Sequence, residues 1–345
     1  MTARSTSTSS SAQRLPLKMK VPSDYALPTR CTMPTPDSLR VFDDPEHFES
    51  VEIPTNGIRL RVRVAGAPTS KKLALCLHGF PESSYSWRYQ MTLLADLGYR
   101  VYAPDLRGYG ASDKPPRVAD YRIQELVQDV AGLIDHFRGT AGDGEVVLLA
   151  HDWGGAVAWH FALRRVRPID RLIVLNMPHP RRLAQALGRW GPQLLRSWYI
   201  FMFQLPWLPE RYLARNDHHA IAAAFVGMAV DRSRFPPEVL HVYRREAARP
   251  GALRGMLAYY RAAARYRTTV RYPPLETPTL MIWGEEDTAL GKELTDRTDE
   301  LVRNLTLRFV PRCSHWVQQE APEIVNAMLE DWLRGREVRG AADLA

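Results

Sequence analysis

A chain of 345 residues with 45% hydrophobic and 24% charged residues has the composition of a globular protein, and its length suits one large α/β domain with an insertion. The net charge of +8 would permit binding to nucleic acid, but the sequence has no zinc-ligand spacing, no RNA-binding aromatic motif and no glycine-rich phosphate loop. We therefore assign the excess charge mainly to solvated surface and expect no nucleic-acid partner. No apolar run approaches ~18 residues, so we expect no membrane span.

Residues 1–45 differ in composition from the rest of the chain, because a Ser/Thr-rich start is followed by scattered prolines. We expect a poorly ordered arm here. The arm has no apolar stretch of the kind that a secretory signal needs, but it has basic residues and no acid before Asp24. An organelle transit peptide is therefore the alternative for this segment.

Three cysteines, Cys31, Cys76 and Cys313, are scattered along the chain. This spacing supplies neither a disulfide framework nor a zinc site, and Cys76 lies in an apolar run, where a free cysteine behaves as a small hydrophobic side chain. We therefore expect a reducing, cytoplasmic compartment and no metal.

From residue 46 onward the pattern predicts strands that alternate with helices. Alternating apolar residues on both sides of Asn56-Gly57 predict a β-hairpin. Continuous apolar runs predict strands buried on both faces of a parallel sheet, and apolar residues at helical spacing predict amphipathic helices. The expected strands are 73–77, 100–103, 146–150, 171–176, 279–283 and 305–310, and the expected helices are 87–97, 123–137 and 320–333.

The alternation stops between residues 181 and 268, where helical periodicity and many aromatic residues replace the strand pattern. We interpret residues 181–268 as a helical cap inserted into an α/β core made of residues 46–180 and 269–337, with a mostly parallel sheet flanked by helices. A cap over the carboxyl ends of the strands would enclose a largely apolar pocket.

The most informative stretch follows the predicted strand 146–150. Asp152 lies between a buried strand and a helix, with small residues at Ala150, Gly154 and Gly155. This pattern is typical of a nucleophile elbow, a tight turn that presents one side chain to a cleft, here with Asp where Ser is commoner. A carboxylate attacks an sp3 carbon without first losing a proton, which favours displacement at carbon over esterase chemistry. Asp is also a favoured helix N-cap, so this stretch alone leaves a capping role open.

Three further groups follow predicted strands. His315 comes after the last strand, and Asp287, with the two preceding glutamates as rivals, comes after the strand before it, so a carboxylate could orient the imidazole. The backbone N–H groups of Phe80 and Trp153 could form an oxyanion hole for the hydrolysis of an Asp152 ester. The order of nucleophile, acid and histidine is that of α/β-hydrolases.

Four segments together make residues 50 to 335 similar to the α/β-hydrolase-fold epoxide hydrolases, a family related to the haloalkane dehalogenases. The segments are His78-Gly79-Phe80-Pro81-Glu82, Asp105-Leu106-Arg107-Gly108-Tyr109-Gly110-Ala111-Ser112-Asp113-Lys114-Pro115, His151-Asp152-Trp153-Gly154-Gly155 and Ser314-His315-Trp316-Val317-Gln318-Gln319-Glu320. The resemblance implies that Asp152 is the nucleophile, His315 the base that activates water and Asp287 the orienting acid.

Members of this family hold the epoxide oxygen with two tyrosines of the cap. The segments 197–204 and 258–261 resemble the two tyrosine segments, which implies this role for Tyr199 and Tyr260. Because Ala258 stands where relatives often have Asn, the neighbouring Tyr259 is the alternative to Tyr260. From the same motifs, we expect the substrate to contact a further set of side chains: His78, Trp153 and Trp316.

The expected reaction converts a small-molecule epoxide and water into a vicinal diol, a detoxification chemistry that requires no metal or organic cofactor. The alternative is a haloalkane dehalogenase that uses the same Asp152. A dehalogenase needs N–H donors for the halide, and Trp153 would suit it, but the Phe80 side chain has no donor. A catalytically inactive hydrolase fold that serves as a binding protein would be expected to lack one of these residues. The oligomeric state stays open.

Overall fold

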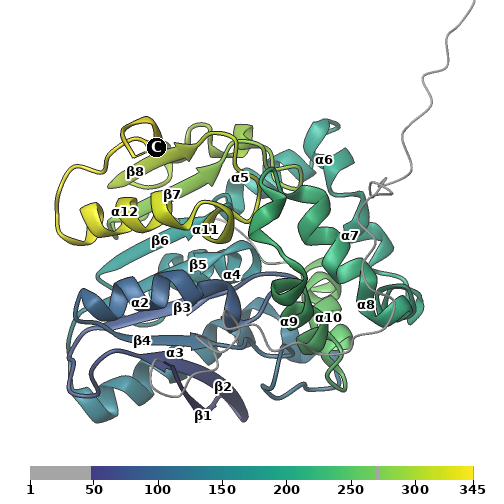
Figure 1. Ribbon diagram of the computed structural model, residues 1–345, viewed down its shortest axis with the longest axis horizontal. Coiled ribbons are helices and arrows are strands. Elements are labelled where there is room, and N and C mark those ends of the chain that lie inside the picture. The colour runs from purple at the N-terminus through teal and green to yellow at the C-terminus, as the bar shows by residue number, and fades with distance from the viewer. Residues whose placement is uncertain (1–47, 267, 269–271, 345) are drawn as a thin grey trace, which may run out of the picture. The chain divides into compact units, whose positions relative to one another are not determined.

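The computed structural model describes residues 48–266, 268 and 272–344 (Figure 1). Every described residue belongs to one compact unit. The arm expected at residues 1–45, together with Cys31, lies outside the described residues.

The described residues form an eight-stranded sheet in the order β1-β2-β4-β3-β5-β6-β7-β8. Only the pairs that involve β2 are antiparallel, and β3 to β8 run parallel to one another. The strands are β1 Glu49–Thr55, β2 Ile58–Ala65, β3 Leu73–Leu77, β4 Arg100–Pro104, β5 Val146–His151, β6 Arg171–Leu175, β7 Thr279–Gly284 and β8 Leu305–Val310. The predicted hairpin, the six predicted strands and the mostly parallel sheet are therefore confirmed.

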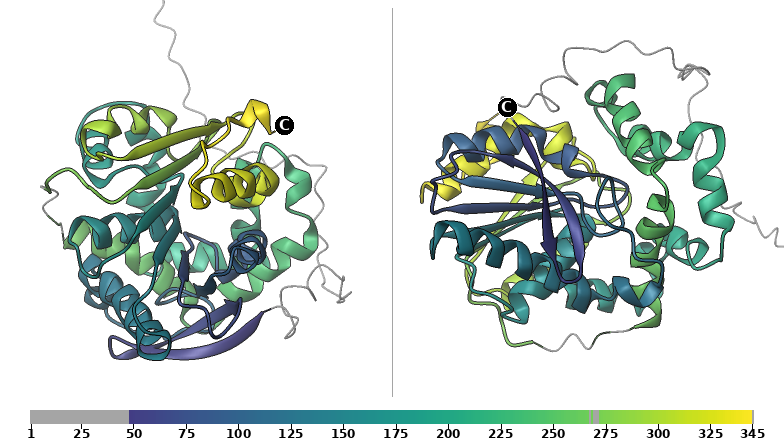
Figure 2. Two further views of the ribbon diagram at one scale, coloured as in Figure 1. Left: turned by 90° about the vertical axis from the view of Figure 1, so that its left-hand side faces the viewer. Right: turned by 90° about the horizontal axis from the view of Figure 1, so that it is seen from below.

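Helices cover both faces of the sheet. The helix pair α2 and α12 packs together, as does the pair α3 and α4, and Figure 2 shows the sheet between the two pairs. The bounds are α2 Arg88–Asp96, α3 Ile123–Ala141, α4 Asp152–Leu163, α11 Val317–Glu320 and α12 Pro322–Leu333. The predicted helix 320–333 is wrong at its start, because Pro322 lacks the backbone N–H that would continue α11 and instead opens α12.

Between β6 and β7 the described residues form only helices, which we call the helical segment (residues 180–265). These are α5 Pro180–Leu187, α6 Pro192–Arg196, α7 Trp198–Met202, α8 Leu208–Met228, α9 Pro237–Ala247 and α10 Ala252–Arg265, with a short 3-10 turn at Arg232–Arg234. Proline opens α5, α6 and α9, where its missing N–H costs no hydrogen bond. Non-helical backbone interrupts α8 at Arg215–His218. No helix among the described residues is long and apolar enough to cross a bilayer.

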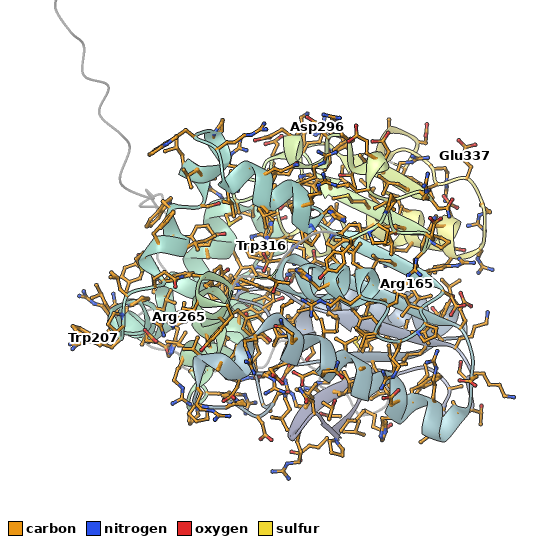
Figure 3. All side chains as sticks on the ribbon, turned by 180° about the vertical axis from the view of Figure 1, so that it is seen from behind. Arg165, Trp207, Arg265, Asp296, Trp316 and Glu337 are labelled. Carbon is orange, nitrogen blue, oxygen red and sulfur yellow. The ribbon has the colours of Figure 1, made fainter. Side chains whose placement is uncertain are left out.

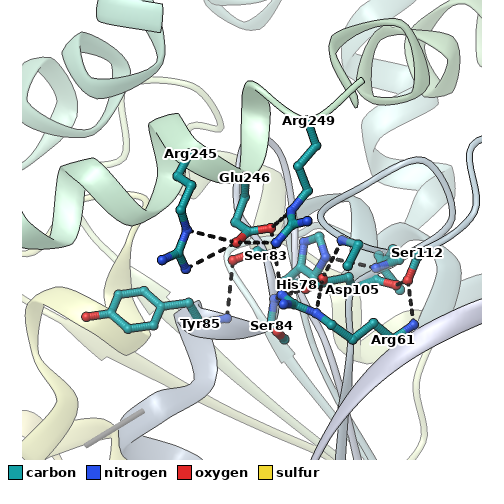
Figure 4. A network of polar contacts seen from close by, with 12 residues as sticks. Arg61, His78, Ser83, Ser84, Tyr85, Asp105, Ser112, Arg245, Glu246 and Arg249 are labelled. Carbon is teal, nitrogen blue, oxygen red and sulfur yellow. Dashed lines mark hydrogen bonds and ion pairs between the residues drawn. The ribbon is translucent and has the colours of Figure 1, made fainter. Parts of the chain in front are cut away.

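A buried polar network joins the helical segment to the sheet (Figure 4). Arg61 of β2 pairs with Asp105, at the end of β4, with Nη2 and Oδ2 2.7 Å apart, and it also lies 3.7 Å from Glu246 of α9. Arg249 completes the network with an ion pair of 2.5 Å to Glu246. Although burial raises the pKa of Asp105, Arg61 and His78 lower it to about 2. The carboxylate is therefore ionised and holds the contact between the two parts.

We predict opposite effects for two glycines of α3. A Cβ on Gly132 would lie 1.9 Å from Oγ1 of the buried Thr55, whereas a Cβ on Gly139 meets nothing within 4 Å. Gly132→Ala should lower the free energy of unfolding by about 1–3 kcal/mol. Gly139→Ala should raise it by about 0.5–1 kcal/mol, because alanine has the better helix propensity. Urea denaturation measures both, and equal effects would contradict this account of the packing.

Candidate active site

Asp152 begins α4 directly after β5, with a positive φ of 47°. A side chain in this left-handed region is strained, and the close packing of the turn maintains it. A Cβ on Gly154 would lie 2.2 Å from the carbonyl oxygen of Leu77, and one on Gly79 would lie 2.4 Å from the Cβ of Asp152. The small residues of the motif are therefore required by contact distance, and the turn directs the carboxylate away from the sheet edge.

The backbone N–H of Phe80 donates a hydrogen bond of 2.7 Å to Oδ1 of Asp152. Trp153 follows Asp152 in the first turn of α4, where backbone N–H groups have no partner within the helix. The loop that carries Phe80 is itself fixed, because the Gly79 N–H donates to Oε2 of the buried Glu82 at 2.8 Å. One oxygen of the nucleophile candidate thus already accepts a backbone N–H, that of Phe80.

Two strand ends bring His315 and Asp287 to Asp152. Nδ1 of His315 lies 2.7 Å from Oδ2 of Asp287, and Nε2 lies 3.7 Å from Oδ2 of Asp152. Asp287 is buried and accepts the backbone N–H groups of Ala289 and Leu290 with its other oxygen, each at 2.8 Å. The imidazole therefore sits between two carboxylates, with one of its nitrogens directed at each.

The protonation states follow from this arrangement. Burial raises the pKa of Asp152, but the hydrogen bond and positive charge of His315 together with the Phe80 N–H bring it below its ordinary value. Burial lowers the pKa of His315, but the charge of Asp287 and the contacts with both carboxylates outweigh it and raise this pKa to about 10. At neutral pH the pair is therefore an ionised carboxylate beside an imidazolium.

Tyr199 of α7 and Tyr260 of α10 lie together on the side of the helical segment that faces Asp152. Their ring centroids are 6.0 Å apart, and the ring of Tyr260 packs edge-on against Phe80 at 5.3 Å and Trp153 at 5.0 Å. Burial raises the pKa of both phenols, and the negative charge of Asp152 raises each further. Both are therefore neutral hydroxyl donors at neutral pH.

The hydroxyl of Tyr259, the alternative to Tyr260, is directed at a backbone oxygen and not at Asp152. Its hydroxyl donates to the backbone oxygen of Arg107 at 2.9 Å, and its ring packs against Tyr109 and Tyr121. The charge of Asp152 is not among the causes that raise its pKa. The geometry therefore favours Tyr260 for the second oxygen-binding tyrosine.

His78 does not fit the expected contact with substrate. Its ring is buried, Nδ1 lies 2.9 Å from the backbone oxygen of Gly79, and Nε2 accepts the backbone N–H of Leu106 at 3.0 Å. Because both ring nitrogens have backbone partners, we correct its role to bracing the Phe80 loop against β4. Trp316 is buried beside His315 at a ring distance of 4.9 Å, and its contact with substrate stays a prediction, as does that of Trp153.

Sequence reasoning missed Asn176, which follows β6 with a positive φ of 42°. Its Nδ2 donates to Oδ2 of Asp287 at 2.8 Å, and its Oδ1 accepts the backbone N–H of Gly284 at 3.0 Å. The amide therefore orients the same carboxylate oxygen that binds His315. Asn176 is the last residue of the predicted strand 171–176, and a polar side chain at the end of an apolar run was the available signal.

A second buried network was also missed, although its residues lie in the quoted motifs. Nδ1 of His151 lies 2.8 Å from Oε2 of Glu82, and Nε2 lies 2.8 Å from the backbone oxygen of His315. Gln318 and Gln319 donate to the other Glu82 oxygen at 2.9 and 2.8 Å. The network ties the Phe80 loop to the His315 loop. Among the described residues, no group of three His, Cys, Asp or Glu side chains could hold a metal ion.

Comparisons with known proteins bear on the fold and the family of this chain. A family model described as alpha/beta hydrolase fold matches residues 75–322. The chain is 42% identical over 283 residues to the AB hydrolase superfamily protein YfhM of Bacillus subtilis (strain 168), covering 82% of this chain and 96% of the relative. It is 36% identical to epoxide hydrolase 4 of Homo sapiens, covering 82% of this chain and 78% of the relative. The solved structure of a Bacillus megaterium epoxide hydrolase with an inhibitor has a TM-score of 0.75 and 28% identity, covering 82% of this chain and 100% of that one.

The position of His315 between two carboxylates predicts how its pKa changes in a variant, and this can be tested without substrate. Asp152→Asn removes one of the two negative charges beside the imidazole, so the pKa of His315 should fall well below its value of about 10. NMR titration of ring-labelled histidine measures this pKa, and Glu285→Gln, which removes a carboxylate that pairs with Lys292, is the control. An unchanged pKa in Asp152→Asn would show that Asp152 does not interact with the imidazole.

Proposed function

Since this chain belongs to the α/β-hydrolase-fold epoxide hydrolase family, we propose that it adds water to epoxides through a covalent ester on Asp152. The observation that carries this proposal is the position of one ionised carboxylate at the elbow, between an imidazole on one side and two phenols on the other. We assign residues 181–268 the role of a cap that contributes those phenols and excludes bulk water during attack.

The first step opens the ring. Oδ1 of Asp152 accepts the Phe80 N–H, so Oδ2 is the oxygen free to attack a ring carbon, and the C–O bond on that carbon breaks. Tyr199 and Tyr260 hydrogen-bond the departing oxygen, and one of them gives it a proton as negative charge builds. The product is a hydroxyalkyl ester of Asp152, and its carbonyl oxygen is Oδ1, already beside the Phe80 N–H.

Ester formation then changes the titration of its neighbours. The ester carries no charge, so the imidazolium of His315 loses one of its two carboxylate partners and its pKa falls. The phenols lose the same negative charge, which lowers their pKa values as well. The proton that His315 releases balances the one that a tyrosine gave to the alkoxide. The loss of negative charge at Asp152 thus makes His315 a base only after alkylation, and alkylation is the step that must come before hydrolysis.

The second step hydrolyses the ester. Neutral His315, held by Asp287, takes a proton from a water that adds to the carbonyl carbon, and the N–H groups of Phe80 and Trp153 stabilise the resulting oxyanion. The intermediate then collapses: the bond between the carbonyl carbon and the alkyl oxygen breaks, and that oxygen takes the proton of the added hydroxyl. The vicinal diol leaves, and the Asp152 carboxylate and the His315 imidazolium are restored. Asn176 and Asp287 exchange no bond or proton in this step, but they orient the imidazole of His315 so that its Nε2 faces Asp152.

A haloalkane dehalogenase remains the second candidate within the fold. Trp153 is the side chain that would suit a halide, but its ring packs edge-on against the ring of Tyr260 at 5.0 Å. Tyr199 and Tyr260, whose pKa values the charge of Asp152 raises, are hydroxyl donors, which suit an oxygen leaving group. We also propose a reducing, cytoplasmic compartment, because Cys76 and Cys313 are buried free thiols.

The ester should accumulate when its hydrolysis is blocked. His315→Gln leaves the attacking carboxylate in place but removes the base, so the peptide that contains Asp152 should gain the mass of one epoxide per chain. Mass spectrometry after a single-turnover reaction with styrene oxide measures the adduct. Asp152→Asn treated in the same way is the control and should show none. Normal turnover by His315→Gln would rule out His315 as the base.

The two phenols should act on the first step. Tyr199→Phe and Tyr260→Phe should each slow alkylation by about a hundredfold, because each hydroxyl stabilises charge that develops in the transition state. The double variant should be nearly inactive on epoxides. Tyr259→Phe is the matched control, since its hydroxyl binds the backbone of Arg107. Rapid-quench kinetics measures the rates. Alkylation at the wild-type rate by the double variant would make the phenols packing residues and favour the dehalogenase.

A further inference from the structure

The outer side of helices α6 to α8 exposes a run of large apolar side chains. Trp190 is 93% exposed, and Phe201 and Trp207 are each 63% exposed. Figure 3 places Trp207 at the outer edge of the protein, whereas Trp316 lies inside it. We call the following exposed residues the outer apolar face: Trp190, Leu195, Trp198, Phe201, Leu205, Trp207, Leu208 and Tyr212.

The exposed side chains come from one continuous stretch of the chain, from the turn before α6 to the first turns of α8. Within α7, Trp198 and Phe201 are three positions apart, and within α8, Leu208 and Tyr212 are four apart, so each pair lies on one side of its helix. Figure 1 shows α6, α7 and α8 in succession along the side of the helical segment away from the sheet. The inner side of the same run is also apolar, since Phe203 is buried against Tyr260. A helical run that is apolar on both sides is not adapted to water alone.

The charges in the stretch that carries the outer apolar face are mostly positive. Between residues 181 and 216 the chain has six arginines and one acid, Glu210, which is paired with Arg261 at 2.5 Å. Two of the six arginines pair with glutamates of the core. The other four are exposed, and no carboxylate of the described residues pairs with them: Arg181, Arg189, Arg211 and Arg215. The face therefore combines tryptophan, leucine and phenylalanine with unneutralised guanidinium groups.

We propose that this face binds peripherally to an anionic membrane surface. Tryptophan is enriched at the boundary between hydrocarbon and lipid headgroups, leucine and phenylalanine insert below it, and arginine attracts anionic headgroups. Self-association fits less well, because a symmetric contact would place the same arginine-rich surface against itself. Binding through this face would leave the sheet outside the membrane and place α7, which carries Tyr199 on its other side, next to the lipid.

The test uses the full-length protein and phosphatidylcholine vesicles with and without phosphatidylserine, with sedimentation as the measure of binding. The protein should bind the anionic vesicles, and added salt should weaken binding. W190S/F201S/W207S should lower the affinity at least tenfold. R189Q/R211Q should also lower it, by about tenfold or more. Epoxide hydrolysis in solution should stay unchanged in both variants, since neither touches the catalytic residues.

Matched variants on the core separate this face from the general basic charge. R59Q/R303Q removes two exposed arginines from strand edges, and Y89S removes an exposed aromatic from α2. Neither should change vesicle binding by more than about twofold. Equal losses in the core and face variants would overturn the proposal, as would failure of the wild type to bind anionic vesicles. Concentration-dependent dimers that W190S/F201S/W207S abolishes, without vesicle binding, would show that a second copy covers the face.

Discussion

His315 is buried between the carboxylates of Asp152 and Asp287, and the rest of the site depends on that charge arrangement. Burial alone would favour the neutral imidazole, so the raised pKa of His315 results from the two negative charges at short range. Each carboxylate needs its own support. Asp287 has the amide of Asn176 and two backbone N–H groups, and Asp152 has the Phe80 N–H. These polar contacts make buried charge tolerable where the strands end.

The loops that carry these groups are tied to one another below the reacting atoms. Glu82 receives the Gly79 N–H from one loop and two glutamine amides from the other, while His151 bridges Glu82 and the backbone of His315. Because the members come from three different segments, displacement of one loop would leave buried donors or acceptors unpaired, which costs more than the contacts themselves contribute. The distance between the Phe80 N–H and the imidazole is therefore fixed before substrate arrives.

Much of the sheet and of the candidate site could be predicted from the sequence, and the reason is physical. Parallel strands buried on both faces are continuous apolar runs, and the residues after them gather at one edge of the sheet. Position therefore made Asp152, Asp287 and His315 candidates, although it left Glu285 and Glu286 as rivals of Asp287. Contacts between segments distant in sequence have no such pattern. Asn176 and the Glu82–His151 network depend on such contacts. His78 does too: its place in a functional motif suggested contact with substrate, although both of its ring nitrogens bind backbone groups.

The same electrostatic arrangement links stability to the order of the reaction. The pKa of His315 rises from about 6.5 when unfolded to about 10 in the fold, so its protonation stabilises the fold fully below about pH 6.5, and this contribution is lost as the pH rises through about 10. The form that stabilises the resting protein is thus the imidazolium, which cannot act as a base. A neutral ester at Asp152 removes one of the charges that maintain it. In the free protein the two carboxylates therefore favour the imidazolium form of His315. Only in the covalent intermediate is the neutral imidazole favoured, and this is the form that hydrolyses the ester.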